Sequence, residues 1–149
     1  FGLSYARAYR TGGVAINRRR TQAVEYDPEF TNNYELSYKL RGRNFRLSTN
    51  LFYIDWRDQQ VQVQLSNDFY DTQVENAASS RVLGGEVESR VEVGGGNSVH
   101  LGAGYSDTRF RSFVSGGRDY SGNTFPFASK VTGRLAFEAQ VADPLVSLW

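Results

Sequence analysis

The sequence contains no cysteine, only three prolines and no uninterrupted apolar run long enough for a membrane-spanning helix. Without cysteine there can be no disulfide framework, no thiolate zinc site and no thiol nucleophile. A transmembrane helix needs about 20 apolar residues in succession, so that class of membrane protein is excluded. The 17 Lys and Arg against 16 Asp and Glu give a net charge of +1, which offers no electrostatic case for a nucleic-acid partner.

The sequence is rich instead in aromatic residues, at 14%, and in glycine, with 15 residues. This combination favours extended strands joined by glycine turns. Apolar and polar residues alternate with a period of two in segments 34–41, 83–93, 99–106 and 130–138. Because successive side chains of a strand point to opposite faces, each segment is predicted to be a β-strand with one apolar and one charged face.

Short and long connections alternate along the chain. Compact turn signals at 42–44, 94–97 and 142–144 separate long polar stretches at 10–32, 66–73 and 111–124. Between them we expect about seven strands, at 1–9, 33–41, 45–65, 74–93, 98–110, 125–140 and from Leu145 onward. The strict alternation breaks at 51–54, which predicts a β-bulge or a change of phase in the predicted strand 45–65.

Short turns at one end and long loops at the other are typical of an all-β, antiparallel up-and-down transmembrane β-barrel. Aromatic residues near the strand ends, such as Tyr5, Tyr34 and Trp56, fit the girdles at the two membrane interfaces. Two alternatives remain at this point. One is a small closed barrel with a structural or adhesin-like role, and the other is a soluble β-sandwich binding module, in which the aromatics would be core residues.

Several motifs in succession resemble the late, C-terminal-half barrel region of TonB-dependent outer-membrane receptors. They are YRTGG at 9–13, DPE at 27–29, NYEL at 33–36 with Lys39, LFYIDWRDQQ at 51–60, NA at 76–77 and GGEVE at 84–88. Their order and spacing agree over nearly the whole chain, although each motif alone is weak.

The resemblance implies a 22-stranded barrel with an N-terminal plug domain. It also implies energised uptake of a scarce nutrient, first a ferric siderophore, otherwise cobalamin, haem or a glycan. We therefore expect residues 1–149 to be one β-barrel segment, a partial slice of that barrel without its plug. The expected partners are outer-membrane lipid, a small-molecule nutrient such as a ferric chelate, and TonB through a plug domain outside this chain; the expected location is the bacterial outer membrane.

Arg18, Arg19 and Arg20 lie in the long 10–32 stretch, which should face the outside. Three guanidinium groups could capture an anionic ligand such as a ferric chelate, or bind lipopolysaccharide phosphates. Tyr26 could add an aromatic contact to the ligand. The alternative is a solvated run of charge in a surface loop.

A second group of charges is expected to face the lumen of the barrel: Glu86, Glu88, Arg90, Glu92, Lys130 and Arg134. A ladder of cross-strand ion pairs with no transport role is the alternative. His100, the one histidine, has no evident carboxylate partner and is interpreted as an ordinary lumenal residue.

Catalytic motifs are nearly absent from the sequence. GLSYA at 2–6 superficially resembles a nucleophile elbow but lies within a strand pattern, and no helix follows the glycines at 94–96. We expect no enzymatic activity, no cofactor and no bound metal, with an outer-membrane protease or lipase as the remaining enzymatic alternative.

Overall fold

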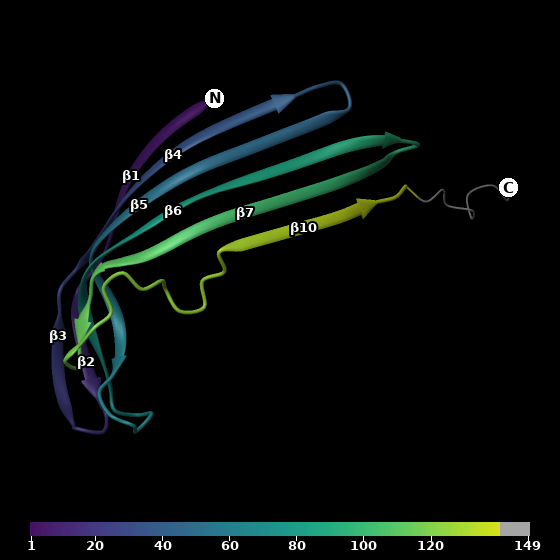
Figure 1. Ribbon diagram of the computed structural model, residues 1–149. Helices are drawn as coiled ribbons and strands as arrows, with labels where there is room; N and C mark the ends of the chain where they lie inside the picture. Colours follow the sequence, from purple (N-terminus) through teal and green to yellow (C-terminus); the bar gives the residue numbers. More distant parts are fainter. Residues whose placement is uncertain (141–149) are drawn as a thin grey trace, which may run out of the picture.

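The computed structural model describes residues 1–140, apart from the side chains at 77 and 78 (Figure 1). Six strands form one antiparallel sheet in the order β1-β4-β5-β6-β7-β10. Their bounds are Gly2–Arg10 for β1, Glu29–Arg41 for β4, Phe45–Gln64 for β5, Thr72–Gly94 for β6, Asn97–Ser112 for β7 and Val131–Glu138 for β10. The described part of the chain contains no helix long and apolar enough to cross a membrane.

Two short hairpins are inserted into this up-and-down order. Strands β2 (Gly13–Asn17) and β3 (Gln22–Tyr26) lie between β1 and β4, and β8 (Val114–Ser115) and β9 (Arg118–Asp119) lie between β7 and β10. At the opposite end the chain reverses in short turns, between β4 and β5 and between β6 and β7. Gly94, Gly95 and Gly96 have φ values of 95°, 61° and 76°, a left-handed conformation that glycine adopts without strain.

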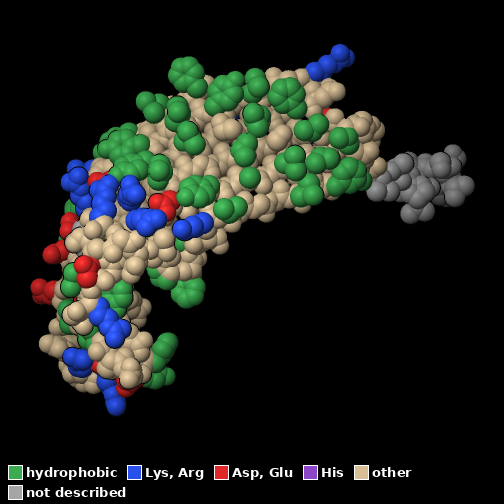
Figure 2. Space-filling view, in the orientation of Figure 1, with side chains coloured by type: hydrophobic (Ala, Val, Ile, Leu, Met, Phe, Trp, Pro, Cys, Tyr) green, Lys and Arg blue, Asp and Glu red, His purple; other side chains and the backbone are tan. Residues whose placement is uncertain are grey.

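One face of the sheet is apolar and exposed, and we call it the apolar face. Figure 2 shows hydrophobic side chains spread over the six-stranded sheet on this side. Leu36, Leu51 and Leu135 are 47%, 58% and 75% exposed, so nothing in the described residues covers them. A soluble sandwich would bury such a face beneath a second sheet, whereas a membrane strand presents it to lipid.

Strand β5 runs through 51–54 with neither the predicted bulge nor a change of phase. Leu51 pairs with Gly85, and the register continues unbroken to Ile54, both toward β6 and toward β4. The prediction was wrong because Phe52 lies on the opposite, polar face, where the absence of a side chain at Gly84 leaves room for its ring. A Cβ added at Gly84 would stand 2.4 Å from that ring. The register irregularities instead lie in the pairing of β6 with β7, where residue 111 of β7 and residue 93 of β6 are left out of the register.

The strand bounds differ from prediction at three places. The polar stretches 10–32 and 111–124 contain the β2–β3 and β8–β9 hairpins, and β4 already begins at Glu29. The last described strand begins at Val131, not at 125, because the Phe125 N–H donates to Thr108 Oγ1 at 3.0 Å and Phe127 has a positive φ of 60°. The turn predicted at 142–144 and the strand predicted from Leu145 lie outside the described residues.

Buried side chains gather at the end of the sheet that carries the inserted hairpins, which we call the loop end. The buried hydrophobic residues of the described chain, Val63 and Phe110, lie there, and so do buried polar residues that include Asn17, Glu29 and Asp71. Strands β2 and β3 both contact β6 in this region. The loop end is therefore the part of the chain with a packed interior of its own.

Candidate functional site

The β2–β3 hairpin is anchored at its base by two side-chain amides. The Asn76 amide donates to the carbonyl oxygens of Asp27 at 2.9 Å and Asp58 at 2.7 Å, and accepts the Asp27 N–H at 2.8 Å. The Gln60 amide donates to the carbonyls of Thr11 and Asp27, both at 3.0 Å. These side chains thus form hydrogen bonds with backbone groups that lie outside the strand pairings. They also hold the hairpin against β5 and β6.

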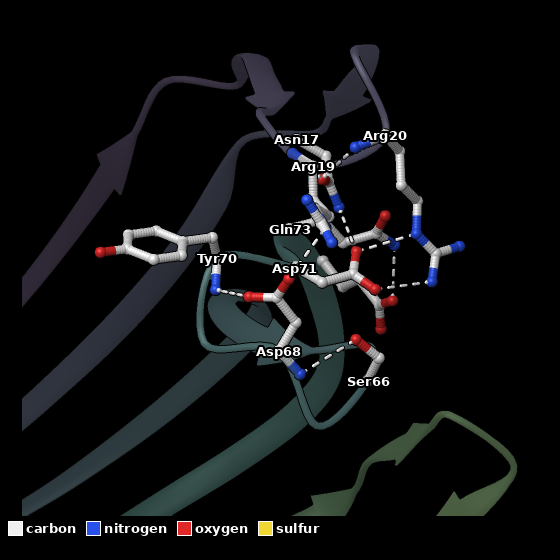
Figure 3. Close-up of polar contacts among 9 residues, drawn as sticks. Asn17, Arg19, Arg20, Ser66, Asp68, Tyr70, Asp71 and Gln73 are labelled. Atoms are coloured by element: carbon white, nitrogen blue, oxygen red, sulfur yellow. Dashed lines mark hydrogen bonds and ion pairs between the residues drawn. The ribbon is translucent and has the colours of Figure 1, made fainter.

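A second anchor joins the tip of the hairpin to the β5–β6 connection (Figure 3). Asn17 Nδ2 donates to Asp71 Oδ1 at 2.8 Å, and the Arg20 guanidinium binds both oxygens of Asp71, at 2.8 and 2.9 Å. Asn17 Oδ1 also accepts the N–H groups of Arg19 and Arg20 at 3.0 Å. Arg19 forms an ion pair with Asp68 at 2.8 Å. Two loops far apart in sequence are thereby clamped together.

The Asp71 carboxylate is strongly stabilised in its charged form. Hydrogen bonds from Arg20 and then from Asn17 hold the pKa of Asp71 well below its usual range, and the same bond to Asp71 raises the pKa of Arg20. A lowered carboxyl pKa stabilises the folded state above the unfolded value of about 3.9, and this contribution is lost as the pH falls below it. The clamp is therefore formed at neutral and mildly acidic pH.

Asp71→Asn is expected to loosen the β2–β3 hairpin. The substitution removes the charge that Arg20 binds at both oxygens, and charge-assisted hydrogen bonds are the stronger ones. Amide hydrogen exchange over residues 13–26 should become on the order of tenfold faster in the intact protein. Glu25→Gln, at an exposed carboxylate of β3, should leave the exchange unchanged. Equal protection in Asp71→Asn and the parent protein would contradict the clamp.

A hollow lies beside this clamp. It is lined by residues of β2 and its turn, the end of β5 and the β5–β6 connection, which include Ile16, Arg18, Val63, Phe69 and Tyr70. Phe69 and Tyr70 are exposed, and their rings meet edge to face with centroids 5.7 Å apart. Among residues 1–140, Arg18 takes part in no ion pair. One guanidinium beside two exposed rings suits an anionic or aromatic ligand.

The structure separates the three arginines that the sequence singled out. Arg19 and Arg20 pair with carboxylates of the β5–β6 connection, while Arg18 lines the hollow. Tyr26 is half-buried opposite Gly13, where its hydroxyl would stand 2.8 Å from an added Cβ, so it packs within the hairpin. Ligand binding by these residues stays a prediction. Phe69 and Tyr70 were missed, although two adjacent aromatics in the polar stretch 66–73 were a visible signal.

The charges expected to face a lumen share the face opposite the apolar one, which we call the polar face. By register, Glu88 lies opposite Gly102, and Gly102 opposite Arg134. Arg90 pairs with Glu92 at 2.9 Å, so part of the set forms ion pairs. The same parity carries Glu86, and Lys130 directly precedes β10. That this face lines a lumen stays a prediction.

His100 has a carboxylate partner that the sequence did not reveal. Its Nε2 lies 3.3 Å from Glu138 Oε2 and 3.1 Å from Ser98 Oγ, because the pairing of β7 with β10 brings together residues 38 positions apart. A catalytic triad would place the hydroxyl and the carboxylate on different ring nitrogens, but here both approach Nε2. Within residues 1–140, no group of three or more His, Cys, Asp or Glu is placed to hold a metal ion.

Comparison with known families decides what these features belong to. The family model described as TonB dependent receptor-like, beta-barrel matches residues 1–145. The chain belongs to the TonB-dependent receptor family. Members of this family are transporters of the outer membrane and not enzymes, so the predicted absence of an enzymatic role is confirmed. The fold class is confirmed too, as antiparallel barrel strands, although residues 1–140 form an open sheet with β1 and β10 at its edges.

A solved receptor of this family has the same arrangement of strands. The ferric yersiniabactin uptake receptor FyuA from Yersinia pestis superposes with a TM-score of 0.70 over 95% of this chain, at 18% identity. At that identity the likeness concerns the fold. This chain covers 21% of the length of that receptor.

Proposed function

We propose that residues 1–149 form part of the barrel wall of a bacterial outer-membrane receptor that takes up a ferric siderophore. The barrel segment would have no plug of its own, and TonB would supply energy through a plug domain outside this chain. In this arrangement the apolar face contacts lipid. The polar face, with Glu86, Glu88 and Arg134, walls an aqueous interior, and the loop end faces the medium.

The hollow formed by Arg18, Phe69 and Tyr70 is the observation that carries the choice of ligand. Ferric siderophore complexes are commonly anionic, and several classes chelate iron through aromatic phenolate or catecholate rings. A guanidinium forms ion pairs with such anions, and exposed aromatic side chains contact the aromatic rings of the chelate. The clamp of Arg20 on Asp71 holds the hollow in one shape before the ligand arrives, which reduces the entropy lost on binding. The solved structure of the same fold is that of a ferric yersiniabactin uptake receptor.

The test is to change the hollow in the intact receptor. Arg18→Gln combined with Phe69→Ala and Tyr70→Ala should weaken binding of the recognised ferric chelate by about tenfold or more, because a charge-assisted contact and two aromatic contacts are lost. Binding is measured by equilibrium titration with a panel of ferric catecholate, phenolate and hydroxamate chelates, together with haem and cobalamin. Growth with each chelate as the sole iron source provides the cellular readout.

Arg43→Gln is the matched control, since Arg43 is an exposed arginine in the short turn at the opposite end of the sheet. It should bind every chelate as the parent does. If the parent receptor bound haem or cobalamin and none of the ferric chelates, the proposed ligand would be wrong. If the triple variant bound the chelate as tightly as the parent receptor does, the hollow would not be part of the binding site.

A further inference from the structure

Three arginines of the polar face stand directly opposite one another near the short turns. In the register, Arg41 of β4 pairs with Arg46 of β5, and Arg46 pairs with Arg90 of β6. We call these three residues the arginine row. Neighbouring strands lie about 4.8 Å apart, and like charges directly opposite each other destabilise a sheet. The arginine row therefore lowers the stability of the sheet unless anions lie close to it.

Carboxylates of the described residues lie beside one member of this row. Arg90 forms ion pairs with Glu92 at 2.9 Å and with Glu138 at 3.2 Å. Among residues 1–140, Arg41 and Arg46 take part in no ion pair, and both are exposed. A guanidinium has five N–H donors, so these two arginines keep donors accessible to another anion.

The arginine row borders a second hollow, which we call the basic hollow. The next row away from the turns consists of Lys39, Ser48, Glu88, Gly102 and Arg134. Because Ser48 is short and Gly102 has no side chain, the surface sinks between the long side chains on either side. The hollow has a volume of about 480 Å³, a size typical of small-molecule sites. Its lining includes five cationic side chains and one carboxylate, that of Glu88.

The basic hollow is distant from the hollow that contains Arg18, Phe69 and Tyr70. Along β5, Val63 of that first hollow lies 17 positions beyond Arg46, which is about 55 Å of extended strand. Figure 1 shows the short turns at the opposite end of the sheet from the inserted hairpins. One small chelate cannot contact both hollows at once. A ligand that binds first at the loop end therefore reaches the basic hollow only in a later step.

We propose that the basic hollow is a second, weaker binding site for the anionic ferric chelate, occupied while the chelate passes through the interior of the receptor. The inference rests on the proposed function, which supplies both the anionic ligand and the aqueous interior. Guanidinium groups form charge-assisted hydrogen bonds with anionic oxygens. Exposed arginines attract the anion and also release it, as the charged rings of anion-selective pores do.

The test measures binding, uptake and stability of the intact receptor, with ferric tris-catecholate as the anionic chelate. The variant Arg41→Gln, Arg46→Gln, Arg134→Gln should bind the chelate with the affinity of the parent, because the hollow at the loop end is unchanged. Its maximal rate of uptake into cells should fall about tenfold, since the interior attracts the anion less. Arg41→Lys, Arg46→Lys, Arg134→Lys should keep most of the rate, because the charge is preserved. The free energy of unfolding should not fall in the glutamine variant, since like charges are removed from opposite positions.

Arg7→Gln, Arg81→Gln, Arg109→Gln removes the same charge from the opposite face and is the matched control, which should keep the uptake rate of the parent. An unchanged rate in the first glutamine variant, or an equal loss in the control, would overturn the proposal. A lower free energy of unfolding in the first variant would also overturn it, because carboxylates of the plug domain would then already bind the arginines. If the parent receptor took up no anionic ferric chelate, the proposed function would fail together with this site, whereas the other outcomes leave the proposed function intact.

Discussion

Leu51→Arg is expected to destabilise the membrane-inserted barrel by roughly 1–3 kcal/mol, between the penalties for an arginine facing lipid near the interface and at the bilayer midplane. Leu51 is 58% exposed on the apolar face and stands opposite Leu36 and Gly85, one row farther from the loop end than Tyr53. Denaturant unfolding of the intact receptor in lipid vesicles measures the change in the free energy of unfolding.

The adjacent position supplies the control for that substitution. Asn50 points to the polar face and pairs with Glu86 in the register, so Asn50→Arg places the new cation beside a carboxylate. It should leave the free energy of unfolding within about 1 kcal/mol of the parent value. If both substitutions lowered the free energy of unfolding by a similar amount, the two faces of the sheet would lie in the same environment.

Gly84→Ala is expected to destabilise the sheet by about 1–3 kcal/mol, as overpacking does in a close-packed site. The new methyl group would stand 2.4 Å from the Phe52 ring and 2.6 Å from the Tyr105 carbonyl oxygen. The ring belongs to a side chain that can rotate, but the carbonyl belongs to the backbone of β7 and moves only if the strand shifts. The midpoint of denaturant unfolding in the intact receptor measures this effect.

Gly102→Ala is the comparison, on the same face of the neighbouring strand. A Cβ there meets Arg134 Cβ at 3.6 Å, an ordinary van der Waals contact. It should be neutral or slightly stabilising, since alanine has less conformational freedom to lose than glycine. A comparable loss at both glycines would show that Phe52 and Tyr105 are not what requires glycine at position 84.

The period-two alternation predicted the six long strands because it is a local pattern, set by which side of a strand each residue faces. It failed at Phe52, whose apolar ring lies on the polar face over Gly84, a match made across two strands. It also missed β2 and β3, whose five-residue strands are too short for a clear pattern and are held in place by contacts with β6.

The candidate site was less predictable, because its contacts join distant residues. Three adjacent arginines looked equivalent in the sequence, but Arg20 reaches Asp71, 51 positions away, while Arg18 remains beside the hollow. The partner of His100 lies 38 positions along the chain. Such pairings follow from the strand register and from how loops fold back on the sheet, neither of which a single sequence pattern specifies.

Strands β5 and β6 contain 20 and 23 residues, although about 10 suffice to cross the hydrocarbon of a bilayer. In the proposed membrane placement, roughly half of each strand stands in water, where ion pairs and amide contacts of the loop end hold it, while lipid surrounds the other half. Each of these strands is therefore stabilised by two different environments, one at each end. A thicker or thinner bilayer changes the stability of the half in lipid through hydrophobic mismatch. Added salt weakens the ion pairs of the half in water by screening their charges.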